Sequence, residues 1–387
     1  MQALGICPKG MEDIASREIS EVISSAARIG EGCITFEINA LADLCKLAYV
    51  TQSLEKVLLL IAKVPFDDKE KGLGSIKKEL QKFQWKDWLG KRTSFRISCQ
   101  SISEKGLSLD EISAELGSIV REVVKELNKF TPKVDLDHPD IILFAFFTSD
   151  ACYLGVDFTG RDLHKREYKI FPHSSSLRGT IAYGLVRIAG FGKKDALMDP
   201  FAHSGEIPIE AAYFQAKMPL QMFAKEKFAF LKLKPLKKFD AGKFLAEIDK
   251  QQQPIKKATI FCADPTVPNL TACKKNAKIA GLQKAINFSR MDIEWLDTKF
   301  KKASIDKIIT HPPELSRQAN QKDREKLYHE FFYQAEFILK KSGTITLIAR
   351  DTEPFKAPAE KYKFSIIHER AVYSGKEPMK VIVFNRP

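Results

Sequence analysis

The most informative residues lie between positions 196 and 212, where the chain reads A-L-M-D-P-F-A-H-S-G-E-I-P-I-E-A-A. An apolar run ends at Asp199, a tight turn with Ser204 and Gly205 follows, and a helix-like segment completes the pattern. A carboxylate and a glycine turn at the carboxyl end of a parallel strand are typical of sites for nucleotide-like cofactors. Glycine lets main-chain amides approach a ligand because no Cβ stands in the way.

Two more acidic residues directly follow apolar runs. Asp264 ends the run 258–263, and Asp292 follows the run 285–288. One carboxylate at the end of a strand is most often a helix cap or a turn former. Three of them after successive predicted strands are harder to obtain by chance, and we expect them to line one shared cleft.

A further segment, I-I-T-H-P-P-E at 308–314, follows the next apolar run. Pro312-Pro313 predicts a rigid turn there. A neutral His311 accepts one hydrogen bond through a ring nitrogen. Glu314 has no aromatic ring, and its side chain carries a negative charge.

Segment 196–212 resembles the first motif of class I S-adenosylmethionine-dependent methyltransferases. The nearest form is the D-P-F-C-G-S-G-T-I-x-I-E-A of RNA methyltransferases that carry a THUMP domain. His203 stands where that family has its first glycine, and Glu206 where it has threonine. The His203 ring then requires that the loop move or that the cofactor bind less closely.

The resemblance implies S-adenosyl-L-methionine as the cofactor. It assigns the methionine tail to Asp199, Ser204 and Gly205, the ribose hydroxyls to Asp264 and the adenine amino group to Asp292. Segment 174–185 resembles an extra helix of the family over the cofactor, which adds Arg178 to the cofactor-binding residues.

The resemblance also assigns the catalytic loop to His311, Pro312, Pro313 and Glu314. Family members that methylate exocyclic amines carry [N/D]-P-P-[Y/F] in this place. Their first side chain and the proline carbonyl accept hydrogen bonds from the amine, while the aromatic ring stacks on the base. His311 and Glu314 replace both of these side chains.

The elements that position these residues belong to the α/β class. Apolar runs of strand length alternate with helical segments after residue 171, which predicts a parallel sheet. The predicted strands are 196–199, 258–263, 285–288, 307–310, 344–349, 364–369 and 379–385. The last two lack an intervening helix and predict an antiparallel edge hairpin. By resemblance, 176–387 is a Rossmann-like methyltransferase domain with a mostly parallel seven-stranded sheet.

The N-terminal part is predicted as two smaller α/β modules. Their predicted elements are helices at 11–23, 40–49 and 110–127 and strands at 33–38, 57–64, 95–100, 141–148 and 152–159. Segments 135–143 and 152–168 resemble the same family. This implies a ferredoxin-like unit over 1–60, a THUMP RNA-binding domain over 61–160 and a linker over 161–175.

Basic residues indicate a polyanionic partner. The formal net charge is +13, from 62 Lys+Arg against 49 Asp+Glu, and neutralised phosphates release condensed counterions. His164, Lys165 and Arg166 are candidate RNA contacts, or else part of a solvated linker or of interdomain packing. The insert 222–257 holds ten lysines with interleaved phenylalanines. It is either a nucleic-acid surface or an amphipathic helix pair with buried phenylalanines.

Composition sets the remaining expectations. The seven cysteines are scattered and never spaced C-x-x-C, so we expect buried free thiols and no metal site. No run has the length of a membrane span and no signal-peptide pattern begins the chain, which favours a cytoplasmic protein.

Two functions remain open from the sequence. The first is a methyltransferase acting on the N2 amine of guanosine in RNA, with tRNA preferred over rRNA. The second is a catalytically inactive RNA-binding protein of the same fold, a scaffold or partner subunit. A nicotinamide-dependent enzyme is disfavoured because the sequence lacks G-x-G-x-x-G. Oligomeric state is not predicted.

Overall fold

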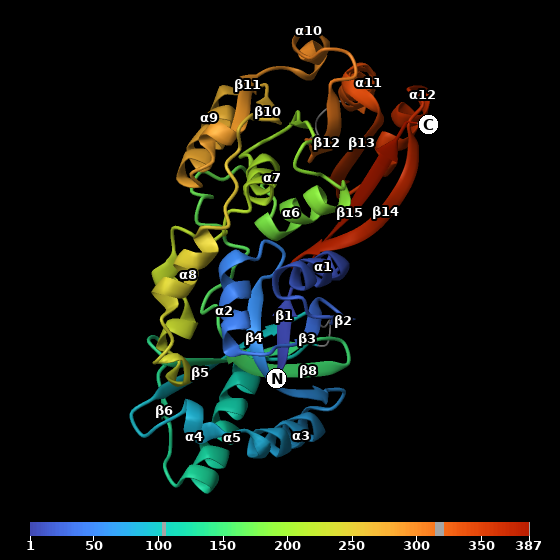
Figure 1. Ribbon diagram of the computed structural model, residues 1–387. Coiled ribbons are helices and arrows are strands. Elements are labelled where there is room, and N and C mark those ends of the chain that lie inside the picture. Colours follow the sequence, from blue (N-terminus) through green and yellow to red (C-terminus); the bar gives the residue numbers. More distant parts are fainter. Residues whose placement is uncertain (103–105, 314–320, 387) are drawn as a thin grey trace. The chain divides into compact units, whose positions relative to one another are not determined.

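The chain forms two compact units (Figure 1). The computed structural model describes residues 1–102, 106–313 and 321–386. Unit 1 comprises Met1–Leu163 and Gln221–Lys250, and unit 2 comprises His164–Leu220 and Gln251–Pro387.

Unit 1 is built on one eight-stranded sheet in the order β2-β3-β1-β4-β8-β7-β5-β6. Its strands are β1 (Gln2–Ile6), β2 (Ala27–Gly30), β3 (Cys33–Glu37), β4 (Lys56–Pro65), β5 (Ser94–Ser101), β6 (Lys133–Val134), β7 (Ile141–Phe147) and β8 (Ala151–Asp157). Strand β4 pairs with β1 on one side and with β8 on the other. The predicted boundary at residue 60 therefore falls inside a strand, and the ferredoxin-like and THUMP parts share one sheet.

The helices of unit 1 cover this sheet with apolar faces. They are α1 (Glu12–Ile23), α2 (Leu41–Val50), α3 (Lys69–Lys82), α4 (Trp85–Trp88) and α5 (Leu109–Asn128). Helix α5 shows why they form, since its buried residues Ile112, Leu116, Val120, Val123 and Val124 recur at helical spacing. It ends at Lys129, which adopts the left-handed conformation (φ 59°) that often terminates helices.

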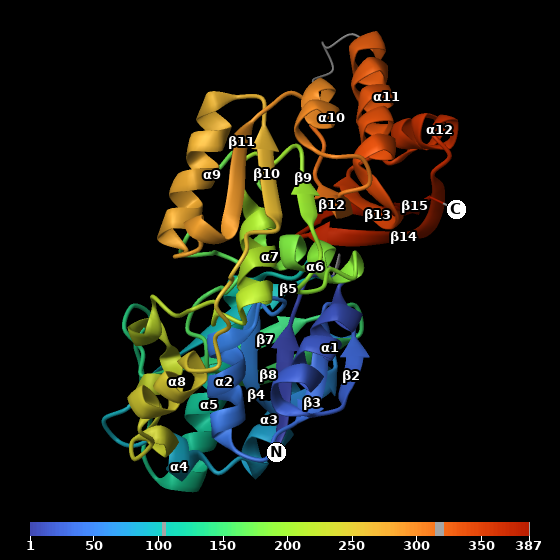
Figure 2. The ribbon, with the colours of Figure 1, turned by 45° about the horizontal axis from the view of Figure 1, so that its top comes forward.

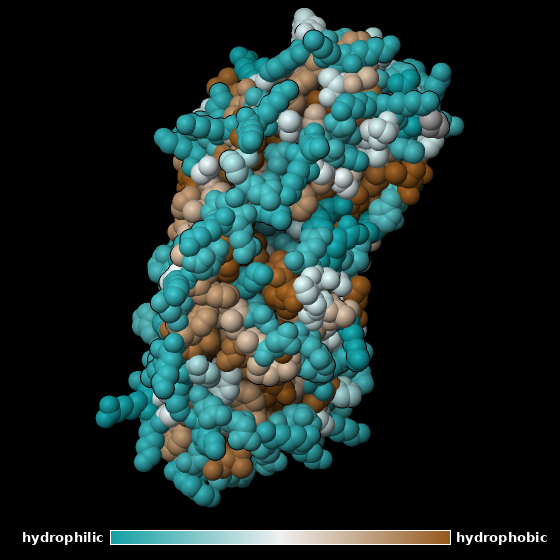
Figure 3. Space-filling view, in the orientation of Figure 1, coloured by the Kyte–Doolittle hydropathy of each residue, from teal (hydrophilic) through white to brown (hydrophobic). Residues whose placement is uncertain are grey.

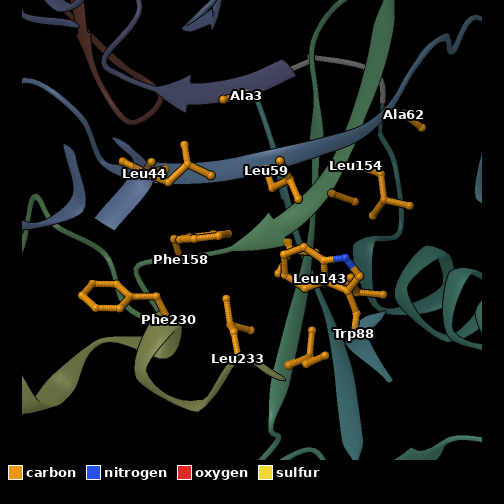
Figure 4. Close-up of a cluster of buried hydrophobic side chains, with 14 of the residues drawn as sticks. Ala3, Leu44, Leu59, Ala62, Trp88, Leu143, Leu154, Phe158, Phe230 and Leu233 are labelled. Carbon is orange, nitrogen blue, oxygen red and sulfur yellow. The ribbon is translucent and has the colours of Figure 1, made fainter. Parts of the chain in front are cut away.

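The basic insert packs with unit 1 as far as Lys250, although the sequence places it within the methyltransferase domain. Its elements are the 3₁₀ turns η1 (Lys225–Lys227), η2 (Ala229–Lys232) and η3 (Lys234–Leu236) and helix α8 (Ala241–Asp249). Phe228, Phe230 and Leu233 are buried in the core of unit 1. Figure 4 shows Phe230 and Leu233 beside Phe158 of the chain that follows β8. These buried phenylalanines agree with the core interpretation of the insert.

Unit 2 is built on a seven-stranded sheet in the order β11-β10-β9-β12-β13-β15-β14 (Figure 2). Its strands are β9 (Leu197–Asp199), β10 (Ile260–Asp264), β11 (Ile286–Arg290), β12 (Ile305–Thr310), β13 (Leu339–Ala349), β14 (Ser365–Ser374) and β15 (Glu377–Asn385). The first five strands are parallel, and β15 is antiparallel to both β13 and β14. The predicted mostly parallel sheet with an antiparallel edge hairpin is confirmed.

The helices of unit 2 bury the two faces of this sheet. They are α6 (Gly179–Ile188), α7 (Glu206–Ala216), α9 (Val267–Ile279), α10 (Leu296–Lys299), α11 (Gln321–Ile338) and α12 (Glu353–Lys361), with the 3₁₀ turns η4 (Gln283–Ala285) and η5 (Ile293–Trp295). Phe331 and Phe332 of α11 and Phe355 of α12 join strand residues in one core. Strand order reverses between β9 and β12, and open α/β sheets bind ligands at such a point.

All seven cysteines are free thiols, and every one except the half-buried Cys99 is buried, as expected. Among the described residues, no helix combines the length and apolar character needed to cross a membrane. The face drawn in Figure 3 is mostly hydrophilic, with apolar patches between the polar residues.

Candidate active site

Three neighbouring strands bring the predicted cofactor acids to one edge of the unit 2 sheet. Strand β9 ends at Asp199 and β10 at Asp264, and Asp292 lies two residues beyond the end of β11. The main-chain N–H of Met291 donates to the main-chain oxygen of Asp264 (3.2 Å), which keeps the chain after β11 beside β10. Because the three strands are adjacent and parallel, the acids emerge at the same edge.

Asp199 lies where the strand order reverses. The Thr310 hydroxyl at the end of β12 donates to its Oδ1 (2.7 Å), and the main-chain N–H of Phe201 donates to the same atom (3.3 Å). Burial raises the pKa of Asp199 to about 8, and these two hydrogen bonds offset that shift only in part. At neutral pH the buried carboxyl group is therefore mostly protonated.

Asp264 is already surrounded by hydrogen-bond donors of the protein. The main-chain N–H of His203 donates to Oδ2 (3.1 Å), and the N–H and hydroxyl of Thr266 donate to Oδ1 (2.9 and 2.8 Å). The Asn269 amide lies within 3.2 Å of both oxygens. A ligand hydroxyl at this carboxylate must replace one of these donors, since a carboxylate accepts about four hydrogen bonds. Asp292, in contrast, is exposed.

His203 occupies the place of the family's glycine with its ring inside the protein. Its φ of 50° is in the left-handed region that glycine adopts at little cost. The ring is stacked on that of His173, with centroids 4.7 Å apart and an angle of 17°. The Nε2 atom lies 2.9 Å from the main-chain oxygen of His311. Burial lowers the pKa of His203, so Nε2 donates as the N–H of a neutral ring.

His311 follows the last residue of β12 and is 7% exposed. Its Nδ1 atom lies 3.1 Å from the main-chain oxygen of Ser175. Burial lowers the pKa of His311 to about 4, and electrostatic interactions with His203, Arg350 and His173 act in the same direction. The Nε2 atom is buried without a hydrogen-bond partner in the described part of the chain.

The proline turn of the predicted catalytic loop is present, although Glu314 lies outside the described residues. Pro312 is buried and Pro313 is half-buried. The hydroxyl of Tyr328 in α11 lies 3.4 Å from the main-chain oxygen of Pro313. Helix α11 thus contacts the turn directly.

Residues 173–176 connect the two loops, and the sequence had predicted only a linker over 161–175 and a segment over the cofactor at 174–185. The main-chain N–H of His173 lies 3.2 Å from the Ser204 hydroxyl, and the Ser176 and Ser204 hydroxyls are 2.6 Å apart. The Ser175 carbonyl contacts His311 as described above. We call residues 173–176 the strap. No sequence signal marks it, because its hydrogen bonds join residues that lie far apart in the chain.

Ser204 and Gly205 form the turn that begins α7. Ser204 is fully buried, and its hydroxyl donates to Glu206 Oε1 (2.7 Å). Gly205 caps the helix with φ 88°, where a Cβ would also approach Cys273 to 3.3 Å. Asn276 of α9 donates to the main-chain oxygen of Ser204 (3.0 Å). These bonds hold the turn at the carboxyl end of β9.

The donors and acceptors suit an adenosyl cofactor, but the space is occupied. A cavity lined by Asp199, His203, Glu206 and His311, together with strap residue Ser175, has a volume of only 10 Å³. That is about the volume a single water requires. This cavity is too small for a methionine tail beside Asp199, and the His203 ring is part of its lining.

Arg178 lies near the turn between β14 and β15 of the unit 2 sheet. It precedes α6, and its Nη2 atom is 2.7 Å from where a Cβ on Gly375 would stand. Gly375 forms the turn between β14 and β15 with φ 70°. The structure thus places this guanidinium against the edge hairpin.

Of the three predicted RNA contacts, only Lys165 is exposed. The side chain of Arg166 is fully buried, and its Nε and Nη2 atoms bond the Glu210 carboxylate at 2.8 and 3.1 Å. The Tyr168 hydroxyl donates to the same carboxylate (2.8 Å). Arg166 is therefore not accessible to a phosphate in this structure, and His164 is half-buried.

Comparisons with known proteins cover nearly the whole chain. Residues 166–379 match the family described as RMKL-like, methyltransferase domain, and residues 70–157 match the THUMP domain. The chain is 28% identical over 369 residues to a tRNA (guanine(6)-N2)-methyltransferase of Methanocaldococcus jannaschii, covering 95% of each protein. It is 27% identical over 379 residues to a protein of the same name from Archaeoglobus fulgidus, covering 97% of this chain and 90% of that one.

One solved structure has the same fold as this chain along the full length of the chain. The protein SMU.472, crystallised with SAH, superimposes with a TM-score of 0.81 at 17% identity, covering 100% of this chain and 98% of the other. Together with the two family matches, this likeness confirms the expected fold of a THUMP-containing N-terminal part followed by a Rossmann-like methyltransferase domain.

Proposed function

This chain belongs to the family of RMKL-like methyltransferase domains, and we propose that it transfers a methyl group from S-adenosylmethionine to the N2 amine of a guanosine in tRNA. One observation supports this most strongly. The two strands that flank the reversal of strand order, β9 and β12, are joined at their carboxyl ends by the hydrogen bond from the Thr310 hydroxyl to Asp199. The predicted cofactor acid and the predicted catalytic loop are thus neighbours.

The cofactor residues follow from the same edge of the sheet. We assign the ribose hydroxyls to Asp264, the adenine amino group to the exposed Asp292, and the methionine tail to Asp199, Ser204 and Gly205. When bound, the cofactor supplies an electrophilic methyl group on a sulfonium. Asp199 ionises more readily beside that positive charge, since an opposite charge lowers the pKa of a buried acid. We also propose Arg178, which lies beside the turn between β14 and β15, as a contact of the cofactor.

The residues after β12 receive the substrate base. His311, Pro312 and Pro313 form its described part, and Glu314 completes the sequence motif. Because Pro312 and Pro313 have no main-chain N–H, this turn presents hydrogen-bond acceptors to an incoming amine. An amine held by acceptors keeps its nitrogen lone pair oriented, and such positioning supplies most of the rate in this kind of transfer.

The choice of tRNA rests on the relatives and on the N-terminal unit. Two relatives that match over nearly their full lengths are named as tRNA guanine-N2 methyltransferases. Unit 1 contains the THUMP domain, and its insert exposes Lys227, Lys232, Lys234, Lys237 and Lys238. Exposed lysines contact phosphates without reading sequence. We propose that the protein acts on tRNA in the cytoplasm.

Methyl transfer with identified products tests the proposal. The purified full chain is incubated with labelled S-adenosylmethionine and unmodified tRNA, and the digested nucleosides are separated. We expect label in N2-methylguanosine. Label in another nucleoside would reject the assigned amine. Cofactor and tRNA binding without any transfer would instead support the inactive RNA-binding protein that the sequence left open.

A further inference from the structure

We infer that the Nε2 atom of His311 accepts a hydrogen bond from the exocyclic amine of the substrate base, and that the carbonyl of Ser175 holds the imidazole ring in the tautomer this requires. This inference rests on the proposed function, because the guanine N2 amine is the methyl acceptor in that proposal. His311 is then the catalytic residue that touches the substrate, and Ser175 is a positioning residue that acts through it.

The tautomer follows from the chemistry of the two neighbours of the ring. The main-chain oxygen of Ser175 only accepts hydrogen bonds, so Nδ1, 3.1 Å away, must carry the proton. The ring is neutral at physiological pH because burial lowers the pKa of His311 to about 4. A neutral imidazole has one proton, and Nε2 is therefore left with a bare lone pair.

This lone pair has no partner in the described residues. Nε2 is buried and makes no hydrogen bond there, whereas native proteins satisfy most buried polar atoms. The next two residues, Pro312 and Pro313, have no main-chain N–H to donate to it. A buried acceptor without a donor can bind a donor that arrives from outside. His311, unlike His329 on α11, carries this atom directly after β12 and lines the same cavity as Asp199.

The chemistry of the atom selects the ligand. A bare acceptor binds an N–H donor such as the N2 amine of guanine. It repels a carbonyl oxygen, and it gains nothing from hypoxanthine, which has hydrogen in place of that amine. The imidazole thus stands where the family has an Asn or Asp side chain, and it offers one acceptor atom.

The same displacement that admits the cofactor also opens a route to Nε2. His203 donates to the main-chain oxygen of His311 and shares the 10 Å³ cavity with it. When the His203 ring leaves, the part of this space that the cofactor tail does not fill becomes accessible to the amine beside His311. The bond from Nδ1 to Ser175 belongs to the strap and does not depend on His203.

Protonation of the ring would abolish the acceptor. The groups whose electrostatic interactions lower the pKa of His311 are His203 on the motif loop, His173 on the strap and Arg350 after β13. The acceptor accordingly persists down to about pH 4. Loss of transfer at pH 5 to 6 would therefore have to come from another group.

The first test reads the tautomer without any substrate. The full chain is labelled with ¹⁵N-histidine, and the His311 signals are identified by their absence in His311→Asn. We expect a protonated Nδ1 and an unprotonated Nε2 between pH 6 and pH 8. A proton on Nε2 in this range overturns the proposal, whether or not the enzyme methylates tRNA.

The second test compares substitutions at this position. His311→Phe keeps a ring of similar shape without an acceptor, and kcat for tRNA should fall by about 100-fold while S-adenosylmethionine affinity stays within threefold. His311→Asn restores an acceptor and should stay within tenfold of the wild type. His329→Phe is the matched control and should transfer normally. His329 lies half-buried on α11 and its Nδ1 is also without a partner in the described residues.

The outcomes separate this proposal from the proposed function. Wild-type transfer together with unchanged transfer by His311→Phe overturns the role of His311 and leaves the function intact. No transfer by the wild type to any guanosine rejects the function, and the role of Nε2 with it. Guanosine and inosine at the target position of the tRNA give the last comparison, and equal transfer rates would exclude the N2 amine as the bound group.

Discussion

The Nε2 atom of His203 lies 2.9 Å from the main-chain oxygen of His311. His203 stands where the family has its first glycine, and His311 stands where it has Asn or Asp. They are 108 positions apart in the sequence and in direct contact in the fold. The two departures are therefore one structural feature, in which the ring on the motif loop is held by the catalytic loop and by His173 on the strap.

His203→Gly should increase affinity for S-adenosylmethionine. The substitution removes the ring that fills the site beside Asp199 and relieves a left-handed backbone conformation. We expect at least tenfold tighter binding by calorimetry. Lys217→Gly is the matched control, because Lys217 also has positive φ (48°) at an exposed position in the same unit. Equal or weaker binding by His203→Gly would show that the ring contributes to the cofactor site.

Asp199→Asn should change how stability depends on pH. The folded-state pKa of Asp199 is raised by burial to about 8 from 3.8. Such a group costs no stability below pH 4 and makes the folded state progressively less stable as the pH rises toward 8. The free energy of unfolding of the wild type should therefore fall more between pH 5 and pH 8 than that of Asp199→Asn. Parallel urea-unfolding curves for both proteins across this range would contradict the assigned shift.

Arg166→Met should destabilise unit 2 because it leaves Glu210 buried without its counter-charge. Breaking a buried pair typically costs about 3–5 kcal/mol. Lys165→Met, at the neighbouring exposed position, should change the free energy of unfolding by less than about 0.5 kcal/mol. Arg166→Met combined with Glu210→Leu should recover most of the loss. A double variant as unstable as the single one would mean that Tyr168 or the surrounding packing carries the effect.

The exposed lysines of the insert should contribute to RNA affinity through phosphates. Lys237→Gln with Lys238→Gln should weaken tRNA binding and lower the slope of log K against log salt by roughly one to two units. Lys301→Gln with Lys302→Gln, an exposed pair in unit 2, is the control with the same change in charge. Identical slopes for both pairs would remove the insert from the RNA surface.

Local patterns predicted most of the fold because apolar periodicity reports burial directly. Each predicted strand of unit 2 overlaps an observed one, and the lack of a helix between the last two predicted strands indicates the edge hairpin correctly. Strand β1 (Gln2–Ile6) was missed because only seven residues precede the Pro8-Lys9-Gly10 break. Helix α3 was missed because Gly72 and Gly74 weaken its helical pattern.

Long-range partners set the limit of the site prediction. The acids at strand ends were predictable because parallel strands share an edge. Arg166 looked like a surface residue because its partner, Glu210, lies 44 positions away. The strap was assigned to a linker because its contacts with Ser204 and His311 leave no local signature. The insert's phenylalanines remained ambiguous because the same spacing serves a core and a surface.

Calorimetric titration of S-adenosylmethionine into the full chain tests the central claim, that the acids at neighbouring strand ends form one cofactor site. The account predicts one site per chain, at least tenfold weaker binding by Asp264→Asn and unchanged binding by Asp306→Asn. Asp306 is a suitable control because it bonds the main-chain N–H of Ala196 at the opposite edge of the same sheet. No binding by the wild type, or equal affinity in Asp264→Asn, would contradict the account.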